Sequence, residues 1–171
     1  SAAINGTGSS NQPTGVLNTS GIGSVVGGTN GAAPDWADIV DLESAVAIDN
    51  ADMGALGFLT NAATRGKLLQ TEKASGTAQY VWSDSNTLRG YNAAVSNQVP
   101  SNGTKGTGTA LSSMVFGNWN DLIIGTWGGI DINVDTSTGS ASGTVRVVAL
   151  QDVDIAVRHA ESFAAMTDII T

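Results

Sequence analysis

The sequence predicts an α+β fold, in which a body of helices and strands carries a protruding two-stranded arm. Glycine supplies 22 of the 171 residues and charged residues only 13 %, a composition typical of turns and extended strands. Two segments nevertheless begin with residues that cap helices. Near the C-terminus, apolar and polar residues alternate over residues 145–157, and a strand of that length spans roughly 43 Å. Such a strand must run out of the packed body.

Composition and charge exclude several classes of protein. The chain has no cysteine and one histidine, so it holds no disulfide, no thiolate metal site and no two-histidine zinc motif. No apolar run approaches the roughly 20 residues of a transmembrane helix. Fifteen acidic against seven basic residues give a net charge of −8. We therefore expect no membrane and no sequence-specific nucleic-acid partner.

The N-terminal region is extended and is followed by a capped helix. Residues 1–34 are rich in Gly, Asn, Ser and Thr, with spaced apolar residues. A stretch of this length without regular elements is uncommon inside a domain, so we expect it to lie along a larger surface. Asp35 is the expected N-cap, Asp38 completes a capping box, and the apolar spacing predicts a helix to about Asn50. The chain starts at Ser1 without methionine or an apolar leader, from which we expect a processed or truncated chain.

The middle of the chain alternates short strands with a second helix. Apolar residues predict strands over 55–60 and 91–99 and a strand or hairpin arm over 78–82. Asn61 is expected to cap a helix that runs to about Glu72. Glycine and small polar residues predict a mobile surface loop over 101–110.

The last third carries the strongest pattern. Short apolar strands are predicted over 111–116 and 122–124, around a turn at 117–121. Alternation then predicts a strand over 130–135, a polar turn over 136–143 and the long strand over 145–157. The two alternating segments form the predicted arm.

No candidate for catalysis or metal binding is supported by its context. Asp131, Asn133 and Asp135 resemble the start of an EF-hand loop, but Thr136 and Ser142 stand where that loop needs Gly and Glu. We interpret them as the solvated face of the arm. His159 could serve Ser162 or Ser112 as a base with Asp154 or Asp152 as its orienting carboxylate, yet no nucleophile motif is present. The glycines around Gly6 and Gly8 and the lone Lys105 lack the strand and helix of a phosphate-binding loop. We expect no catalytic residue, no metal and no cofactor, and hence a protein that is not an enzyme.

Five segments resemble, in order along the chain, motifs of a known family. They are Gly6-x-Gly8 with Pro13-Thr14-Gly15, the strand and helix start over 58–69, the segment 88–100, the turn Phe116-Gly117-Asn118-Trp119, and the closing segment 153–163. Each is similar to a motif of tailed-phage or prophage major capsid proteins of the Hong Kong 97-type fold. Because the five keep the family's order and cover almost the whole chain, the chain is identified as a member, matching the C-terminal half only.

This resemblance implies a domain division. Residues 34–127 and 148–171 would form the axial (A) domain, with a central sheet flanked by helices. Residues 1–33 would be an extended segment of the peripheral (P) domain, and 128–147 its protruding β-hairpin arm. The loops 73–79 and 101–110 are candidates for the capsomer axis. Some members link a lysine to an asparagine of the arm with help from a glutamate. The tip 136–143 holds neither Asn nor Glu, so we expect no such bond.

The resemblance also implies a function. The chain would be a structural subunit of an icosahedral capsid, assembling with copies of itself into pentamers and hexamers that enclose DNA, with scaffold and portal proteins as further candidate partners. It would be located in the virion after assembly in the bacterial cytoplasm. Three alternatives stay open: an encapsulin-like nanocompartment shell, an extracellular β-rich adhesin or carbohydrate-binding module, and a glycosidase with paired carboxylates.

Overall fold

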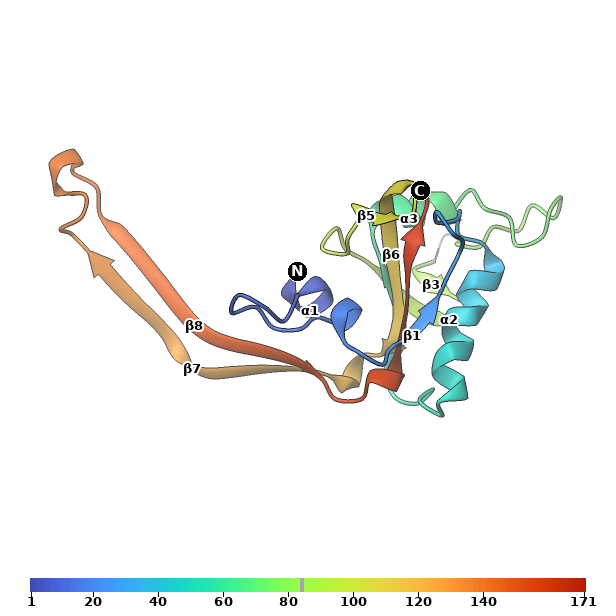
Figure 1. Ribbon diagram of the computed structural model, residues 1–171, viewed down its shortest axis with the longest axis horizontal. Helices are drawn as coiled ribbons and strands as arrows, with labels where there is room; N and C mark the ends of the chain where they lie inside the picture. The colour runs from blue at the N-terminus through green and yellow to red at the C-terminus, as the bar shows by residue number, and fades with distance from the viewer. Residues whose placement is uncertain (84) are drawn as a thin grey trace.

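The computed structural model describes residues 1–83 and 85–171 and has two parts, a body and a long ribbon that projects from it (Figure 1). The body contains a seven-stranded mixed sheet with strand order β1-β9-β6-β2-β4-β3, and β5 is paired to β6. The ribbon consists of β7 and β8 alone. The prediction of an α+β fold with a protruding two-stranded arm is therefore confirmed.

The connections between the elements vary in length, and the longest runs from Leu68 to Thr87. The helices are α1 (Ala2–Asn5), α2 (Trp36–Ile48) and α3 (Ala62–Leu68), with 3₁₀ turns η1 (Val16–Asn18), η2 (Trp119–Asp121), η3 (Ser140–Ser142) and η4 (Ala160–Ser162). The strands are β1 (Gly23–Val25), β2 (Leu56–Thr60), β3 (Thr87–Leu88), β4 (Tyr91–Val95), β5 (Gly103–Lys105), β6 (Gly108–Asn118), β7 (Leu122–Asp135), β8 (Arg146–Val157) and β9 (Phe163–Ile169).

Helix α2 begins where its capping residues predict. The Asp38 amide donates to Asp35 Oδ1 at 3.0 Å, and the Asp35 amide donates to Asp38 Oδ2 at 2.9 Å. This reciprocal pair satisfies two amides that a helix start leaves without partners. The inward residues Ile39, Leu42 and Val46 are fully buried, and they pack in the main core together with Phe58 and Phe116 from the sheet. The capping residues and the spacing of the apolar residues therefore both predict the observed helix α2.

Helix α3 also starts as predicted but ends early. Asn61 Oδ1 accepts the Thr64 amide at 2.9 Å, whereas the helix stops at Leu68 rather than near Glu72. The segment over 78–82, predicted as a strand or hairpin arm, is not a regular strand but runs antiparallel to the chain after α3, with a bridge between Tyr80 and Glu72. Helix α3 ends early because of a tertiary contact. The Trp82 amide donates to the Leu68 carbonyl, and the chain turns back against the end of the helix.

The N-terminal segment is more regular than expected. It contains α1, a 3₁₀ turn and strand β1, which pairs in parallel with β9, so the prediction of no regular element is wrong. Val16 is fully buried in a second cluster with Val115, Phe163 and Ala165. Neighbouring β6 residues point to opposite faces, and Met114 and Phe116 lie in the cluster with α2. The segment thus lies along the sheet face opposite α2, as its spaced apolar residues indicate.

Three differences from the predicted strands and loops remain. The segment 101–110 is not a mobile loop, because β5 and the start of β6 form a hairpin there. The segments 122–124 and 130–135 are one strand, β7, with a register shift between Trp127 and Asp131. Strand β9, which has no predicted counterpart, lies inside the sheet between β1 and β6.

Candidate assembly surface

The two faces of the ribbon differ in chemistry. Residues directly opposite in an antiparallel pair share a face, and the register pairs Val134 with Val147 and Leu150 with Asp131. One face, here the apolar ribbon face, carries mostly apolar and no charged residues, namely Leu122, Ile124, Thr126, Ile132, Val134, Val147, Ala149, Gln151, Val153, Ile155 and Val157. The other, the mixed ribbon face, carries Ile123, Trp127, Asp131, Asn133, Asp135, Arg146, Val148, Leu150, Asp152 and Asp154. Only the apolar ribbon face is free of charge along its length.

The apolar ribbon face continues the core of the body. At its inner end, Leu122 and Val157 are partly buried against the cluster of Val16, Val115 and Phe163. Further out the same face has no cover within the described residues. Ile124, Val134 and Val147 are 59 %, 55 % and 62 % exposed. An apolar core that continues into an uncovered surface marks a site where other polypeptide packs.

The exposed apolar side chains are concentrated on the ribbon. Of the sixteen large hydrophobic residues that are exposed in the described part of the chain, ten lie between Ile123 and Val153. The outer edges of β7 and β8 are also unpaired in the described residues, because each strand bonds only to the other. Long unpaired edges with apolar side chains favour pairing or packing with another chain. The ribbon is therefore the candidate interaction surface.

The acidic residues near the ribbon tip hold a turn. Asp135 Oδ1 accepts the amides of Ser137 at 2.8 Å and Thr138 at 3.1 Å, and both hydroxyls also donate to this carboxylate. The bonds from Thr138 and then Ser137 hold the pKa of Asp135 well below its ordinary value. Asp131, Asn133 and Asp135 alternate along a strand, as expected. No group of three or more metal-ligating side chains occurs among the residues that the structure describes.

The glycine-rich N-terminal loop is closed on itself. A Cβ at Gly6 or Gly15 would lie 2.6 Å from the Ala2 carbonyl oxygen, and Asn18 Nδ2 donates to the Gly6 carbonyl at 2.9 Å. The glycines therefore permit close backbone packing and do not form a phosphate cradle.

Within the described residues no helix is long and apolar enough to span a membrane.

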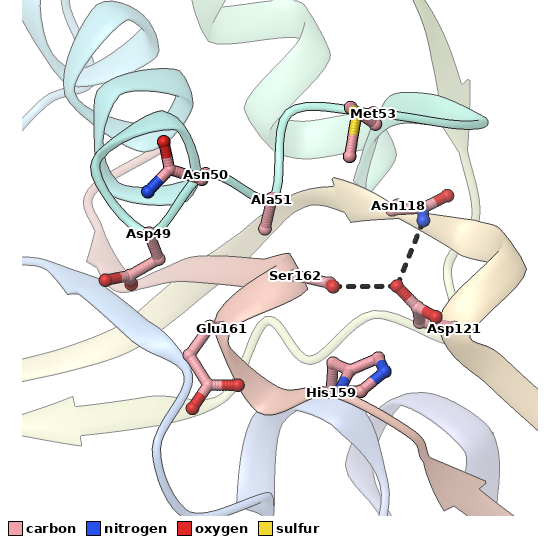
Figure 2. Close-up of a pocket in the computed structure, with 9 residues that line it drawn as sticks. All are labelled: Asp49, Asn50, Ala51, Met53, Asn118, Asp121, His159, Glu161 and Ser162. Atoms are coloured by element: carbon pink, nitrogen blue, oxygen red, sulfur yellow. Dashed lines mark hydrogen bonds between the residues drawn. The ribbon is translucent and has the colours of Figure 1, made fainter.

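His159 lines a pocket together with Ser162, but not with the other partners considered for it. This pocket of about 490 Å³ is lined by His159, Asp121 and Ser162 and by residues that follow α2, among them Asp49 and Asn50. Figure 2 shows these side chains. The Ser162 hydroxyl donates to Asp121 Oδ2 at 2.7 Å, and Asn118 Nδ2 donates to the same oxygen at 3.0 Å. Asp152 and Asp154 lie on the mixed ribbon face, and Ser112 lies in β6. In the part of the chain that the structure describes, Ser162 bonds directly to the Asp121 carboxylate, and no hydrogen bond joins the His159 ring to either of them.

Asp121 instead fastens the ribbon to the body. Its carboxylate links η2 to η4, and its carbonyl accepts the Arg158 amide at 2.8 Å where β8 ends. It is 9 % exposed. Sequence reasoning did not single out this residue, because an aspartate in a polar turn gives no sign of a partner 41 positions away.

Removing the Asp121 carboxylate is expected to destabilise the protein. Asp121→Ala leaves the buried Ser162 hydroxyl without its acceptor, and the free energy of unfolding should fall by about 1–3 kcal/mol. Urea denaturation followed by tryptophan fluorescence measures this change. The control is His159→Ala in the same pocket, an exposed residue that should change the free energy by less than about 0.5 kcal/mol. Equal losses for both variants would contradict the assigned role of Asp121.

Comparison with solved structures defines the class of protein that this fold represents. The capsid protein of an empty GTA particle is 24 % identical, with a TM-score of 0.71, over 99 % of this chain and 60 % of that chain. A protein of Mycobacterium phage Ogopogo is 14 % identical, with a TM-score of 0.65, over 97 % of this chain and 59 % of that chain. The mixed α+β fold with a central sheet and few helices is thus similar to that of phage capsid proteins.

Sequence comparison places the chain more narrowly. It belongs to the phage capsid family, whose model matches residues 1–168, a family of capsid proteins and not of enzymes. The major capsid protein of Halomonas phage phiHAP-1 is 35 % identical over 159 residues, which is 93 % of this chain and 24 % of that protein. The chain therefore spans about a quarter of this relative's length. The family predicted from the five motifs is confirmed.

Proposed function

We propose that the chain is part of the structural subunit of an icosahedral phage or prophage capsid, which assembles with copies of itself into pentamers and hexamers around DNA. The apolar ribbon face carries this proposal, because in a single copy its apolar side chains, which continue the buried cluster of the body, are exposed to solvent. Family membership and the major capsid relative support it. The subunit would reside in the virion after assembly in the bacterial cytoplasm, with scaffold and portal proteins as candidate partners.

Symmetry allows interfaces of modest area to stabilise a closed shell. Each copy would contribute several interfaces of modest area, and closed symmetry repeats them around the particle. Simultaneous engagement raises the total affinity far above that of one contact. The net charge of −8 disfavours a tight hold on phosphates, so the shell would confine DNA rather than bind it.

The domain division remains part of the proposal. Residues 34–127 and 148–171 would form the axial domain, while 1–33 and 128–147 would belong to the peripheral domain. Pairing in the ribbon begins at Leu122 and Val157, so the ribbon extends beyond 128–147 at both ends. Its inner part would connect the two domains. The tip lacks Asn and Glu, and we keep the prediction that it forms no isopeptide bond.

Other functions have weaker support. An encapsulin-like shell shares the fold class, but the family match and the phage relative favour a capsid. An adhesin or sugar-binding module is expected to be a self-sufficient sandwich, which differs from a mixed sheet with a free ribbon. A glycosidase needs two carboxylates across a cleft, and the Asp121 carboxylate is occupied by Ser162 and Asn118.

Particle formation tests the proposal directly. The complete coding sequence that contains this chain, expressed in bacteria with its adjacent phage genes, should yield closed shells. Sedimentation and electron microscopy should show particles with fivefold and sixfold capsomers. A product that stays monomeric or dimeric under these conditions would contradict a capsid function. Particles that enclose a specific protein cargo and no DNA would instead favour the encapsulin alternative.

A further inference from the structure

One buried carboxylate joins three distant parts of the chain. Asp168 in β9 is 2 % exposed, and its Oδ2 accepts Lys105 Nζ at 2.6 Å. The same carboxylate accepts the Gly27 amide at 3.1 Å and the Gly28 amide at 3.4 Å. Asp168 thereby connects the C-terminal strand to the segment after β1 and to the hairpin formed by β5 and the start of β6.

A second contact holds the tip of this hairpin against Asn30. Asn30 Oδ1 accepts the Thr107 amide at 3.0 Å. Gly106 has a φ of +56°, and an added Cβ at Gly106 or Gly108 would collide with Asn30. The hairpin turn thus wraps around Asn30, and the two glycines allow the close approach.

The hairpin has little else to hold it. Strand β5 has three residues and an irregular register with β6. Between Gly103 and Ala110 no side chain is buried, and the tip residues Gly106 and Thr107 are exposed. Short isolated hairpins are marginally stable in water. Most of the order in this hairpin must therefore come from its polar contacts with Asp168 and Asn30.

We propose that the Lys105–Asp168 ion pair is a latch that keeps the hairpin closed against the N-terminal segment, and that removal of either charge opens it. Asp168 keeps its two amide donors when Lys105 loses its charge. The rest of the sheet therefore stays paired while the hairpin loses its main anchor. Lys105 is 35 % exposed at its side chain, so solvent and modifying reagents reach the amine from the outside.

The charges around Asp168 set the condition under which the latch opens. Burial alone raises the pKa of Asp168, but Lys105 and the amides of Gly27 and Gly28 outweigh it and hold the pKa below 3.8. Asp38, in the first turn of α2, adds a like charge that opposes ionisation only weakly. Because the folded pKa is lowered, the stabilisation is present above pH 3.8 and is lost as the pH falls below it. At neutral pH the latch opens only when the Lys105 amine loses its charge, as on acylation.

Hydrogen exchange read by mass spectrometry tests the latch at neutral pH. In Lys105→Met, amides of the hairpin over 103–108 should exchange about tenfold faster, as expected for the loss of a charged hydrogen bond. Amides of β2 and β4 should be unchanged, and Lys105→Arg should restore most of the protection. Lys67→Met on α3 is the control for removal of a lysine charge and should leave the hairpin unchanged.

The outcomes separate the latch from general instability. Unchanged hairpin exchange in Lys105→Met would overturn the proposal, and so would a uniform rise across the whole sheet. Asp168→Asn is a second variant that keeps the side-chain shape, and it should open the hairpin because it removes the charge, while the Asn oxygen still accepts the Gly27 amide. Wild-type protection factors should stay constant between about pH 7 and pH 5, because Asp168 remains ionised there. This test uses the folded chain alone, so its result does not depend on whether the protein assembles into a capsid.

Discussion

Replacing Val147 by lysine is expected to abolish particle assembly without unfolding the chain. Val147 is 62 % exposed and lies opposite Val134 at the outer part of the apolar ribbon face. In the free chain a lysine there is solvated, so the free energy of unfolding should change by less than about 0.5 kcal/mol. In an assembled shell the same ammonium would be buried against apolar groups, which costs several kcal/mol without a partner. Closed symmetry repeats this cost in every copy.

The matched control uses the neighbouring face of the same strand. Leu150 is 61 % exposed and lies opposite Asp131 on the mixed ribbon face. Leu150→Lys should therefore form a favourable cross-strand pair and leave assembly largely intact. Sedimentation of the complete protein should show at least a tenfold lower particle yield for Val147→Lys than for Leu150→Lys. Equal yields would show that the apolar ribbon face is not the assembly surface.

Replacing Gly117 by alanine is expected to destabilise the body by about 3 kcal/mol, at the upper end of typical overpacking effects. Gly117 lies in β6 between Gly57 of β2 and Phe163 of β9. An added Cβ would lie 2.9 Å from Phe163 Cα and still closer to the Ser162 carbonyl oxygen. Both are backbone atoms, so relief requires the central strands to separate. Urea denaturation measures the loss.

The control is another glycine-to-alanine change. Gly66 lies within α3, and nothing lies within 4 Å of a Cβ added there. Gly66→Ala should therefore keep or raise the free energy of unfolding, by up to about 1 kcal/mol, because alanine is the better helix former. The prediction for Gly117 fails if both variants change stability in the same direction and by a similar amount.

The physical basis of one family motif becomes visible at this position. In Phe116-Gly117-Asn118-Trp119, Phe116 is fully buried and lies 4.4 Å from Phe58 between ring centroids. Asn118 accepts the amide of Ala55 at 3.0 Å, and Trp119 Nε1 donates to the Gly57 carbonyl at 3.0 Å. Each residue of the motif thus fastens β6 to β2 or to β9.

Signals that act over a few residues could be predicted from the sequence. The starts of α2 and α3 were predictable because Asp35 and Asn61 bond to amides three residues later. The alternation over 145–157 predicted the ribbon because a long two-stranded ribbon repeats every second residue. The ends of the elements were less predictable. Helix α3 stops at Leu68 because the Leu68 carbonyl accepts the amide of Trp82, a residue far along the chain.

Features that depend on distant contacts were missed. Strand β9 contains Phe163, Ala164, Ala165 and Met166, all buried, and a run that is buried on both faces shows no alternation. The hairpin over 103–108 is polar and glycine-rich, and its order depends on Asp168 and Asn30. The candidate site was predictable only in part, because the sequence indicated the arm but not which of its faces continues the core.

The sequence by itself therefore determined the fold class, the helix starts, the projecting ribbon and the family. Capping and alternation are local properties that act over a few residues, and the order of the motifs is read directly along the sequence. Only the tertiary structure decided that Asp121 fastens the ribbon root, that Asp168 orders the hairpin, and that one ribbon face is left uncovered. Each of these depends on contacts between residues far apart in the chain, and such contacts leave no periodic signal along it.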